Sequence, residues 1–175
     1  MAGVVIEESG MKFGEYNNED VFHIENSGTY ISMFREKDTK TVEFVLCHND
    51  DLIFLEAKTS TPNYKNAATE ENKRKYDKFV SAINQKFCNS VDLYFSTLLG
   101  RHGKPEISQK LLGLDYSNIN VLLVIVIRNG SEYKDSLRHY QEKFNKNLRT
   151  KMNLWRISRV LVIDEETARK KGLII

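Results

Sequence analysis

Two glutamates and a lysine stand on two neighbouring stretches that are rich in strand-forming residues. Glu43 lies within Thr41-Val-Glu-Phe-Val-Leu-Cys47, and Glu56 and Lys58 lie within Leu52-Ile-Phe-Leu-Glu-Ala-Lys58. Paired carboxylates suit Mg²⁺ or Mn²⁺, which take oxygen ligands, and a nearby ammonium can hold an attacking water and face a phosphate oxygen. These residue types therefore favour metal-assisted displacement at phosphorus.

The residues between the two stretches, His-Asn-Asp-Asp, are turn formers, so the pattern predicts a β-hairpin. A two-residue loop at Asn49 and Asp50 suits a primed turn, because Asn and Asp tolerate positive φ angles best after Gly. Paired positions then sum to 99, which puts Glu43 opposite Glu56 with their Cβ atoms roughly 5 Å apart. Two like charges at that distance need a cation, which Lys58 on the same face or a bound metal would supply.

Two other interpretations of these residues remain open. Asp50 or Asp51 could replace Glu43 as the first carboxylate, but Asp51 and Glu56 would lie about 16 Å apart along a strand, too far for one metal ion. Both aspartates suit an ordinary turn. Alternatively, the glutamates and Lys58 form a solvent-facing, salt-bridged surface, which contributes little to stability. Against this, three apolar residues continue the same face and predict that it is covered: Val45, Leu52 and Phe54.

The elements that position these residues follow from the hydrophobic pattern. A 3-4 spacing of apolar residues predicts a long helix over about 68–99, ended by Gly100. The wholly apolar run 121–127 predicts a strand covered on both faces, and 159–163 predicts a second one. The other face of the hairpin is apolar, and we expect it to pack inward on the core helices; its residues are Phe44, Leu46, Ile53 and Leu55.

Shorter elements flank this core. Residues 4–6 and 11–13 predict short strands, and helix-like spacing predicts an amphipathic helix near 20–34. A further helix follows Asn129 and runs to about 148, and a last one covers 164–171. The order predicts an α/β or α+β fold: a mixed sheet built from hairpin, helix, strand, helix and strand, with helices on both faces.

Composition limits the kind of protein that the chain can be. Of its 175 residues 41% are hydrophobic and 29% are charged, as in an ordinary globular domain. The net charge of +2 hides a division, because residues 1–100 carry 11 basic and 16 acidic side chains and residues 101–175 carry 15 and 8. A polyanionic partner and an ordinary solvated surface both explain this division. The chain has two cysteines and no pattern of a signal peptide, and its longest apolar run is much shorter than the about 20 residues that a membrane span needs. We therefore expect a cytoplasmic protein with reduced thiols and no membrane partner.

Basic residues at the two ends of the long helix are candidates for contact with nucleic acid. Lys73 and Arg74 open this helix, and Arg101 and Lys104 follow its end; a phosphate-binding role and a plain solvated role are both open for them. The four histidines lack metal-ligand spacing, and no glycine-rich phosphate loop occurs. Two aromatic residues could stack on bases, although a core or loop role also suits them: Tyr64 and Trp155.

The spacing Glu43-x(12)-Glu56-Ala57-Lys58 on two antiparallel strands, followed by a helix and a buried strand, resembles the PD-(D/E)xK nuclease superfamily. The resemblance implies a restriction endonuclease-like fold with an αβββαβ core. It implies that Glu43 and Glu56 are acidic metal ligands, although Glu43 stands where the family usually has Asp. It also implies that Lys58 is the catalytic lysine, that the carbonyl of Ala57 is a further ligand, and that Glu25 adds an acid from the helix before the sheet.

The resemblance covers about residues 20–127 and leaves about 130–175 as a C-terminal αβα extension of one domain, 1–175. It implies a metal-dependent nuclease that acts on DNA ahead of RNA, with Mg²⁺ or Mn²⁺ as cofactor. By analogy, such a small chain works as a homodimer or with a partner subunit in a defence or restriction system. The alternative is a catalytically silent nuclease-like fold that binds nucleic acid or protein. A domain that senses a nucleotide is a third interpretation, and no phosphate loop supports it.

Overall fold

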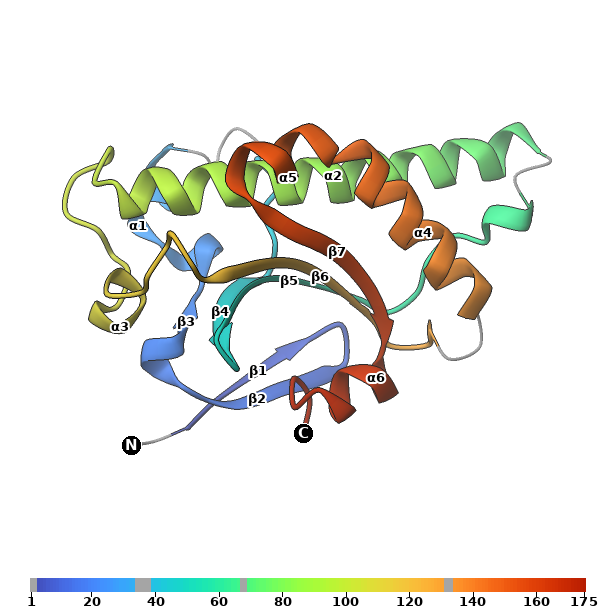
Figure 1. Ribbon diagram of the computed structural model, residues 1–175. Helices are drawn as coiled ribbons and strands as arrows, with labels where there is room; N and C mark the ends of the chain where they lie inside the picture. The colour runs from blue at the N-terminus through green and yellow to red at the C-terminus, as the bar shows by residue number, and fades with distance from the viewer. Residues whose placement is uncertain (1–2, 34–38, 67–68, 131–133) are drawn as a thin grey trace.

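The computed structural model describes residues 3–33, 39–66, 69–130 and 134–175, which form a mixed α/β fold (Figure 1). Its centre is a five-stranded sheet in the order β3-β4-β5-β6-β7. The first three strands pair antiparallel, and β5, β6 and β7 pair parallel. A separate hairpin consists of β1 (Gly3–Glu8) and β2 (Met11–Asn17). The strands of the central sheet are β3 (Val21–Phe22), β4 (Phe44–His48), β5 (Asp51–Lys58), β6 (Asn120–Ile127) and β7 (Ile157–Asp164).

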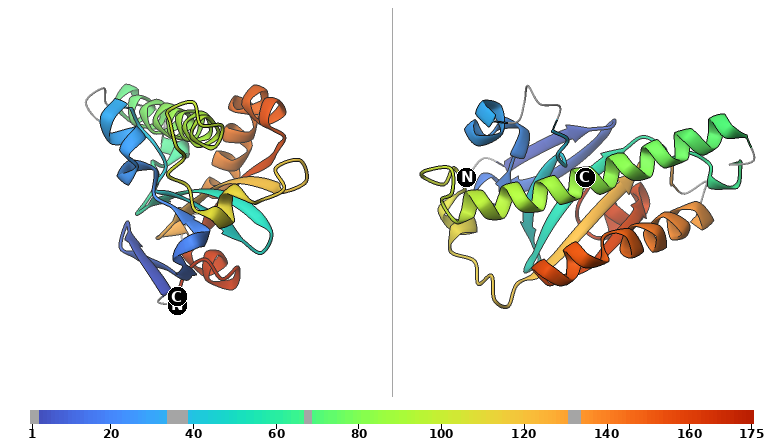
Figure 2. Two further views of the ribbon diagram at one scale, coloured as in Figure 1. Left: turned by 90° about the vertical axis from the view of Figure 1, so that its left-hand side faces the viewer. Right: turned by 90° about the horizontal axis from the view of Figure 1, so that it is seen from above.

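The helices cover the sheet unequally. α2, α4 and α5 lie over one face, whereas the β1–β2 hairpin and α6 lie over the other, so the molecule has three layers (Figures 1 and 2). The helices are α1 (Gly28–Met33), α2 (Glu70–Leu98), α3 (Gln109–Leu112), α4 (Lys134–Asn147), α5 (Arg149–Trp155) and α6 (Glu165–Lys170). In the described part of the chain, short 3₁₀ turns lie between β2 and β3 (η1, Asn18–Asp20), between β3 and α1 (η2, Ile24–Asn26) and between β5 and α2 (η4, Tyr64–Asn66).

The β4–β5 hairpin has the predicted register and turn. The ladder runs from Phe44 opposite Leu55 to His48 opposite Asp51, and every pair sums to 99. Asn49 and Asp50 form the connection with φ angles of 50° and 63°. These positive values are those of a primed turn, whose twist matches that of the two strands.

Both faces of this hairpin are buried. Val45, Leu52 and Phe54 join the core beneath α2, so the prediction of a covered face is confirmed. The opposite face does not pack on the core helices as expected. There, the aromatic rings of Phe13 and Tyr16 from β2 lie against Phe44, with ring centroids 5.6 and 6.3 Å away. A hairpin covers this face because the side chains of β2 alternate between buried and exposed and supply an apolar surface of their own.

The long predicted helix is confirmed, with small differences at its ends. α2 starts after Thr69, whose side chain accepts a hydrogen bond from the backbone N–H of Asn72 (3.2 Å), an N-cap interaction. The helix expected near 20–34 is only partly correct. Val21 pairs with Leu46 in the sheet, and helix α1 starts only at Gly28, because pairing with β4 outweighs the helical spacing.

The C-terminal residues complete the sheet. β6 is the buried parallel strand that the run 121–127 predicts. β7 is parallel as well, but it lies at the edge of the sheet, where Arg159 is exposed and Leu161 is half-buried, so the prediction that both its faces are covered is only partly correct. The helix expected from Asn129 to about 148 is described from Lys134, since residues 131–133 lie outside the described part, and α5 follows it as a separate helix. Among the described residues, no helix is both long and apolar enough to cross a membrane.

Candidate functional site

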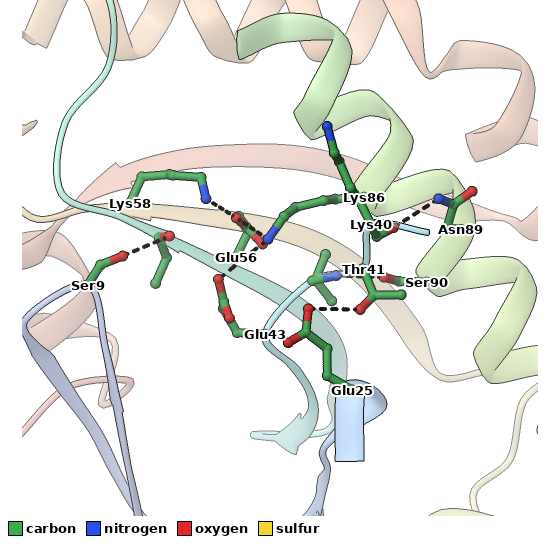
Figure 3. Close-up of polar contacts among 12 residues, drawn as sticks. Ser9, Glu25, Lys40, Thr41, Glu43, Glu56, Lys58, Lys86, Asn89 and Ser90 are labelled. Carbon is green, nitrogen blue, oxygen red and sulfur yellow. Dashed lines mark hydrogen bonds and ion pairs between the residues drawn. The ribbon is translucent and has the colours of Figure 1, made fainter. Parts of the chain in front are cut away.

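Glu43, Glu56 and Lys58 meet on the face of the sheet that α2 covers (Figure 3). β4 begins one residue after Glu43, and the backbone N–H of Glu43 donates to the carbonyl of Leu55 (3.1 Å). Glu56 and Lys58 lie near the end of β5 and share the face of Phe54, since alternate strand residues point the same way. The hairpin ladder stops at Phe44, so the two glutamates are neighbours at its open end and not a ladder pair.

Glu56 is the most deeply buried charged residue of the site. Its side chain has no exposed surface, and its Oε1 lies 2.5 Å from Nζ of Lys58. Nζ of Lys86 on α2 lies 2.9 Å from the same oxygen and 3.0 Å from Oε2. A buried carboxylate is tolerated when such partners compensate for its lost hydration. Two lysines from different elements therefore hold one strand carboxylate in place.

Glu43 is held more loosely than Glu56. Its Oε1 lies 3.5 Å from Nζ of Lys86, and its side chain is 16% exposed. Burial and, to a smaller extent, the charge of Glu56 raise the pKa of Glu43 to about 7, although the charge of Lys86 acts to lower it. Protonated and ionised forms of Glu43 are therefore both accessible near neutral pH.

Lys86 is the residue of this site that sequence reasoning missed. Burial acts to lower the pKa of Lys86, but the charges of Glu56 and Glu43 outweigh this effect and the pKa is raised. The sequence holds one signal for its role. Ile83, three residues before Lys86 on α2, and Ser90, four residues after it, are both buried. Lys86 therefore borders the buried stripe of the helix. A lysine in such a place needs a carboxylate partner.

Hydrogen bonds to α2 position the segment that carries Glu43. The backbone N–H of Val42 donates to Oγ of the buried Ser90 (2.8 Å), and Nδ2 of Asn89 donates to the carbonyl of Lys40 (2.9 Å). These bonds replace the ladder partners that the segment lacks before β4 begins. They fix Glu43 relative to Lys86, because both residues are tied to the same turns of α2 (Figure 3).

Two further carboxylates surround this centre. Glu25 follows Ile24 in η2 and is exposed; its Oε1 accepts a hydrogen bond from Oγ1 of Thr41 (3.3 Å), and its charge contributes to the raised pKa of Lys86. The second carboxylate, Glu8, comes from the end of β1, and no pattern in the sequence predicts its place beside this site. Burial raises the pKa of Glu8, as do the charges of Glu25 and Glu56.

The carbonyl of Ala57 points to the β1–β2 turn. Oγ of Ser9 donates a hydrogen bond to it (3.0 Å). A carbonyl oxygen has two lone pairs, so one remains for another contact. Gly10, next to Ser9, has φ +75° and lies so close to the guanidinium of Arg128 that a side chain here would collide with it. The turn is thus packed against the ends of β5 and β6, beside the site.

The donor chemistry of this site fits a divalent cation. Glu43 and Glu56 offer carboxylate oxygens, Ala57 offers a carbonyl oxygen, and the Lys86 ammonium already bridges the two glutamates as a cation would. Across the part of the chain that the structure describes, no group of three or more His, Cys, Asp or Glu side chains is arranged to hold a metal ion. The candidate set is therefore two carboxylates and one carbonyl.

The basic residues predicted to contact nucleic acid do not gather at one place. Lys73 and Arg74 are exposed near the start of α2, and Arg101 and Lys104 are exposed beyond its end. The helix between them separates the two pairs by about 40 Å. They form two separate patches, one at either end of the helix that carries Lys86.

The alternative ligand Asp51, one of the histidines and the two candidate base-stacking residues, Tyr64 and Trp155, each contact other residues of the fold. Asp51 accepts a hydrogen bond from Nδ2 of Asn120 (2.6 Å) at the far end of β5 from Glu56, which excludes it as a joint ligand. His139 stacks on Tyr64 at 4.1 Å, and Trp155 stacks on Phe95 at 4.5 Å. These aromatic residues hold helices together.

Comparison with known proteins adds no assignment. No protein-family model matches the chain, and the searches of curated proteins and of solved structures returned no match.

Proposed function

We propose that the chain is a metal-dependent nuclease that hydrolyses phosphodiester bonds, with DNA as the substrate to test before RNA. The observation that carries the proposal is the convergence of three residues at the open end of the β4–β5 hairpin: Glu43, the fully buried Glu56, and Lys58. This set combines two acids for a cation with an ammonium for water and phosphate.

The topology supports a restriction endonuclease-like core. Strands β3, β4 and β5 form an antiparallel meander, α2 crosses over it, and β6 adds to the other side of β5 in parallel. One departure stands beside this agreement: α1 lies between β3 and β4, and not before all three strands.

Each residue of the site has a distinct task in this proposal. Glu43, Glu56 and the Ala57 carbonyl would hold Mg²⁺ or Mn²⁺, which would act as a Lewis acid toward a phosphoryl oxygen and would activate water. Lys58 is 31% exposed, so its ammonium reaches both Glu56 and an incoming phosphate. Lys58 orients the attacking water and stabilises the negative charge that develops on the phosphoryl oxygens.

Cleavage of labelled single- and double-stranded DNA and RNA in the presence of Mn²⁺ tests the proposal. We expect Lys58→Ala to cut at least about 100-fold more slowly than the unchanged protein. Lys78→Ala, which removes an exposed lysine from α2, is the matched control and should cut normally. Failure to cut any substrate, or equal cutting by Lys58→Ala, would refute the nuclease proposal.

A catalytically silent nuclease-like fold is the second candidate, and one observation favours it. Both oxygens of Glu56 are occupied by lysine ammonium groups, so the charge of the buried carboxylate is compensated within the chain. Such a cluster serves a binding module as well as an enzyme.

Metal-dependent stability separates the two candidates. Mn²⁺ should raise the melting temperature of a nuclease, because a ligand that binds only the folded state stabilises it. A melting temperature that Mn²⁺ leaves unchanged would favour the silent module.

A further inference from the structure

One ammonium group bridges the two acids of the proposed site. Nζ of Lys86 lies within 3.5 Å of Oε1 of Glu43 and within 3.0 Å of both carboxylate oxygens of Glu56. In the part of the chain that the structure describes, the ammonium of Lys58 forms an ion pair with Oε1 of Glu56 and none with Glu43. The bridging position between the two glutamates is therefore held by the lysine from the helix (Figure 3).

When Glu43 is ionised, the charges of the four ion-paired residues balance. Glu43 and Glu56 then bring two negative charges, and Lys58 and Lys86 bring two positive ones. A divalent ion added to this set would leave an excess of positive charge beside the fully buried Glu56, which is unfavourable where water is excluded. One lysine must leave for such an ion to bind, and Lys86 occupies the oxygens that the ion needs.

The ammonium of Lys86 can leave the position between the two glutamates. Its side chain is 17% exposed and consists of a flexible four-carbon stem that reaches inward from α2. The exposed carboxylate of Glu25 is close enough to attract it. Rotation of the stem would move the ammonium toward solvent and Glu25 without any change in the backbone.

We infer that Lys86 is a built-in counter-ion that occupies the cation position between Glu43 and Glu56, so that the Lys86 ammonium and a divalent metal ion exclude one another. This inference rests on the metal site of the proposed function and adds a regulatory property to it. The site binds metal only in the fraction of molecules whose Lys86 has left, and this fraction reduces the apparent metal affinity.

Mn²⁺ titration of the full chain, followed by the electron paramagnetic resonance signal of free Mn²⁺, tests the inference. Lys86→Gln should bind Mn²⁺ about tenfold or more tightly than the unchanged protein, because the competing ammonium is gone. Lys78→Gln, on the same helix but away from the site, should bind as the unchanged protein does. Lys58→Gln removes an equal charge from the site and should tighten binding less than Lys86→Gln does.

Thermal unfolding provides a second readout for the same variants. Without metal, Lys86→Gln should melt at a lower temperature than the unchanged protein, and Mn²⁺ should raise its melting temperature by more. Lys86→Arg keeps the positive charge, and its planar guanidinium can donate hydrogen bonds to both carboxylates. This variant should therefore fold, and it should bind Mn²⁺ more weakly than the unchanged protein. This variant decides the question if Lys86→Gln does not fold.

Three results would overturn the inference: unchanged or weaker Mn²⁺ binding by folded Lys86→Gln, equal tightening by Lys58→Gln, or Mn²⁺ binding by Lys86→Arg that is as tight as in the unchanged protein. Nucleic-acid cleavage is assayed separately. If Lys86→Gln binds metal more tightly but no protein cleaves nucleic acid, the counter-ion inference is supported and the nuclease proposal is refuted. If the unchanged protein cleaves nucleic acid but Lys86→Gln gains no metal affinity, the nuclease proposal is supported and the counter-ion inference is refuted.

Discussion

Lys86 on α2 and Glu56 on β5 form an ion pair in which one ammonium lies 2.9 Å from Oε1 and 3.0 Å from Oε2 of a carboxylate with no exposed surface. The pair joins the longest helix to the central strand of the sheet. It also sets the separation between that helix and the open end of the β4–β5 hairpin, where Glu43 lies.

Loss of Lys86 should destabilise the fold. Lys86→Met leaves Glu56 with Lys58 as its remaining cation, and we expect the free energy of unfolding to fall by about 2–4 kcal/mol, because a fully buried carboxylate that loses one of its two cations is poorly compensated. Urea unfolding at pH 8 measures the change, with Lys78→Met as the control that stays within about 0.5 kcal/mol. Adding Glu56→Gln to Lys86→Met should recover part of the loss, and strictly additive effects would contradict a direct pair.

Glu43→Gln should change the pH dependence of stability. The pKa of Glu43 is about 7 in the folded chain against 4.5 as its ordinary value, so the folded state holds the extra proton between these values. Stability that protonated Glu43 provides is thus present below about pH 4.5 and is lost as the pH rises to 7.

Glutamine keeps the neutral form at every pH. Glu43→Gln should therefore match the unchanged protein near pH 4.5 and exceed it above pH 7 by at most about 3 kcal/mol. Urea unfolding across pH 4.5–8 measures the difference between the two proteins, to which the other titrating groups contribute little. A difference that stays constant over this range would show that the pKa of Glu43 is not raised.

Ser90→Ala should loosen the segment that carries Glu43. The substitution removes the acceptor of the Val42 N–H, and a buried donor without a partner costs about 1–3 kcal/mol. Metal affinity should also fall, since Glu43 loses its fixed distance from Glu56. Ser81→Ala, at an exposed position of α2, provides the comparison in unfolding and Mn²⁺ titration. Reduced stability with unchanged Mn²⁺ affinity would limit Ser90 to a purely structural role.

The β4–β5 turn offers a test of backbone conformation. Asp50 has a φ of 63°, which glycine adopts freely and a β-branched residue does not. Asp50→Gly should keep or raise the free energy of unfolding by up to about 1 kcal/mol, and Asp50→Val should lower it by about 1–2 kcal/mol. Thermal or urea unfolding distinguishes the two, and equal stability of both variants would contradict a primed turn.

Local patterns predicted the hairpin because its signals lie within a few residues. The strand-forming residues, the Asn49–Asp50 turn and the alternation of faces all act over short distances, and the register follows from them by counting. The apolar stripe of α2 and the apolar run of β6 are local for the same reason. The β3–α1 region was harder, because a two-residue strand depends on its partner β4 and not on its own spacing.

The placement of Glu43, Glu56 and Lys58 on one face was determined by the sequence itself, since strand geometry makes alternate residues share a side. Only the tertiary structure decided which cation lies between the two acids. Lys86 is 30 residues from Glu56 along the chain, and no local pattern specifies how far a helix stands from a strand or which of its turns faces a given carboxylate. Packing of α2 on the sheet settles both, and it brings a helix lysine to the position where the sequence suggested a metal ion.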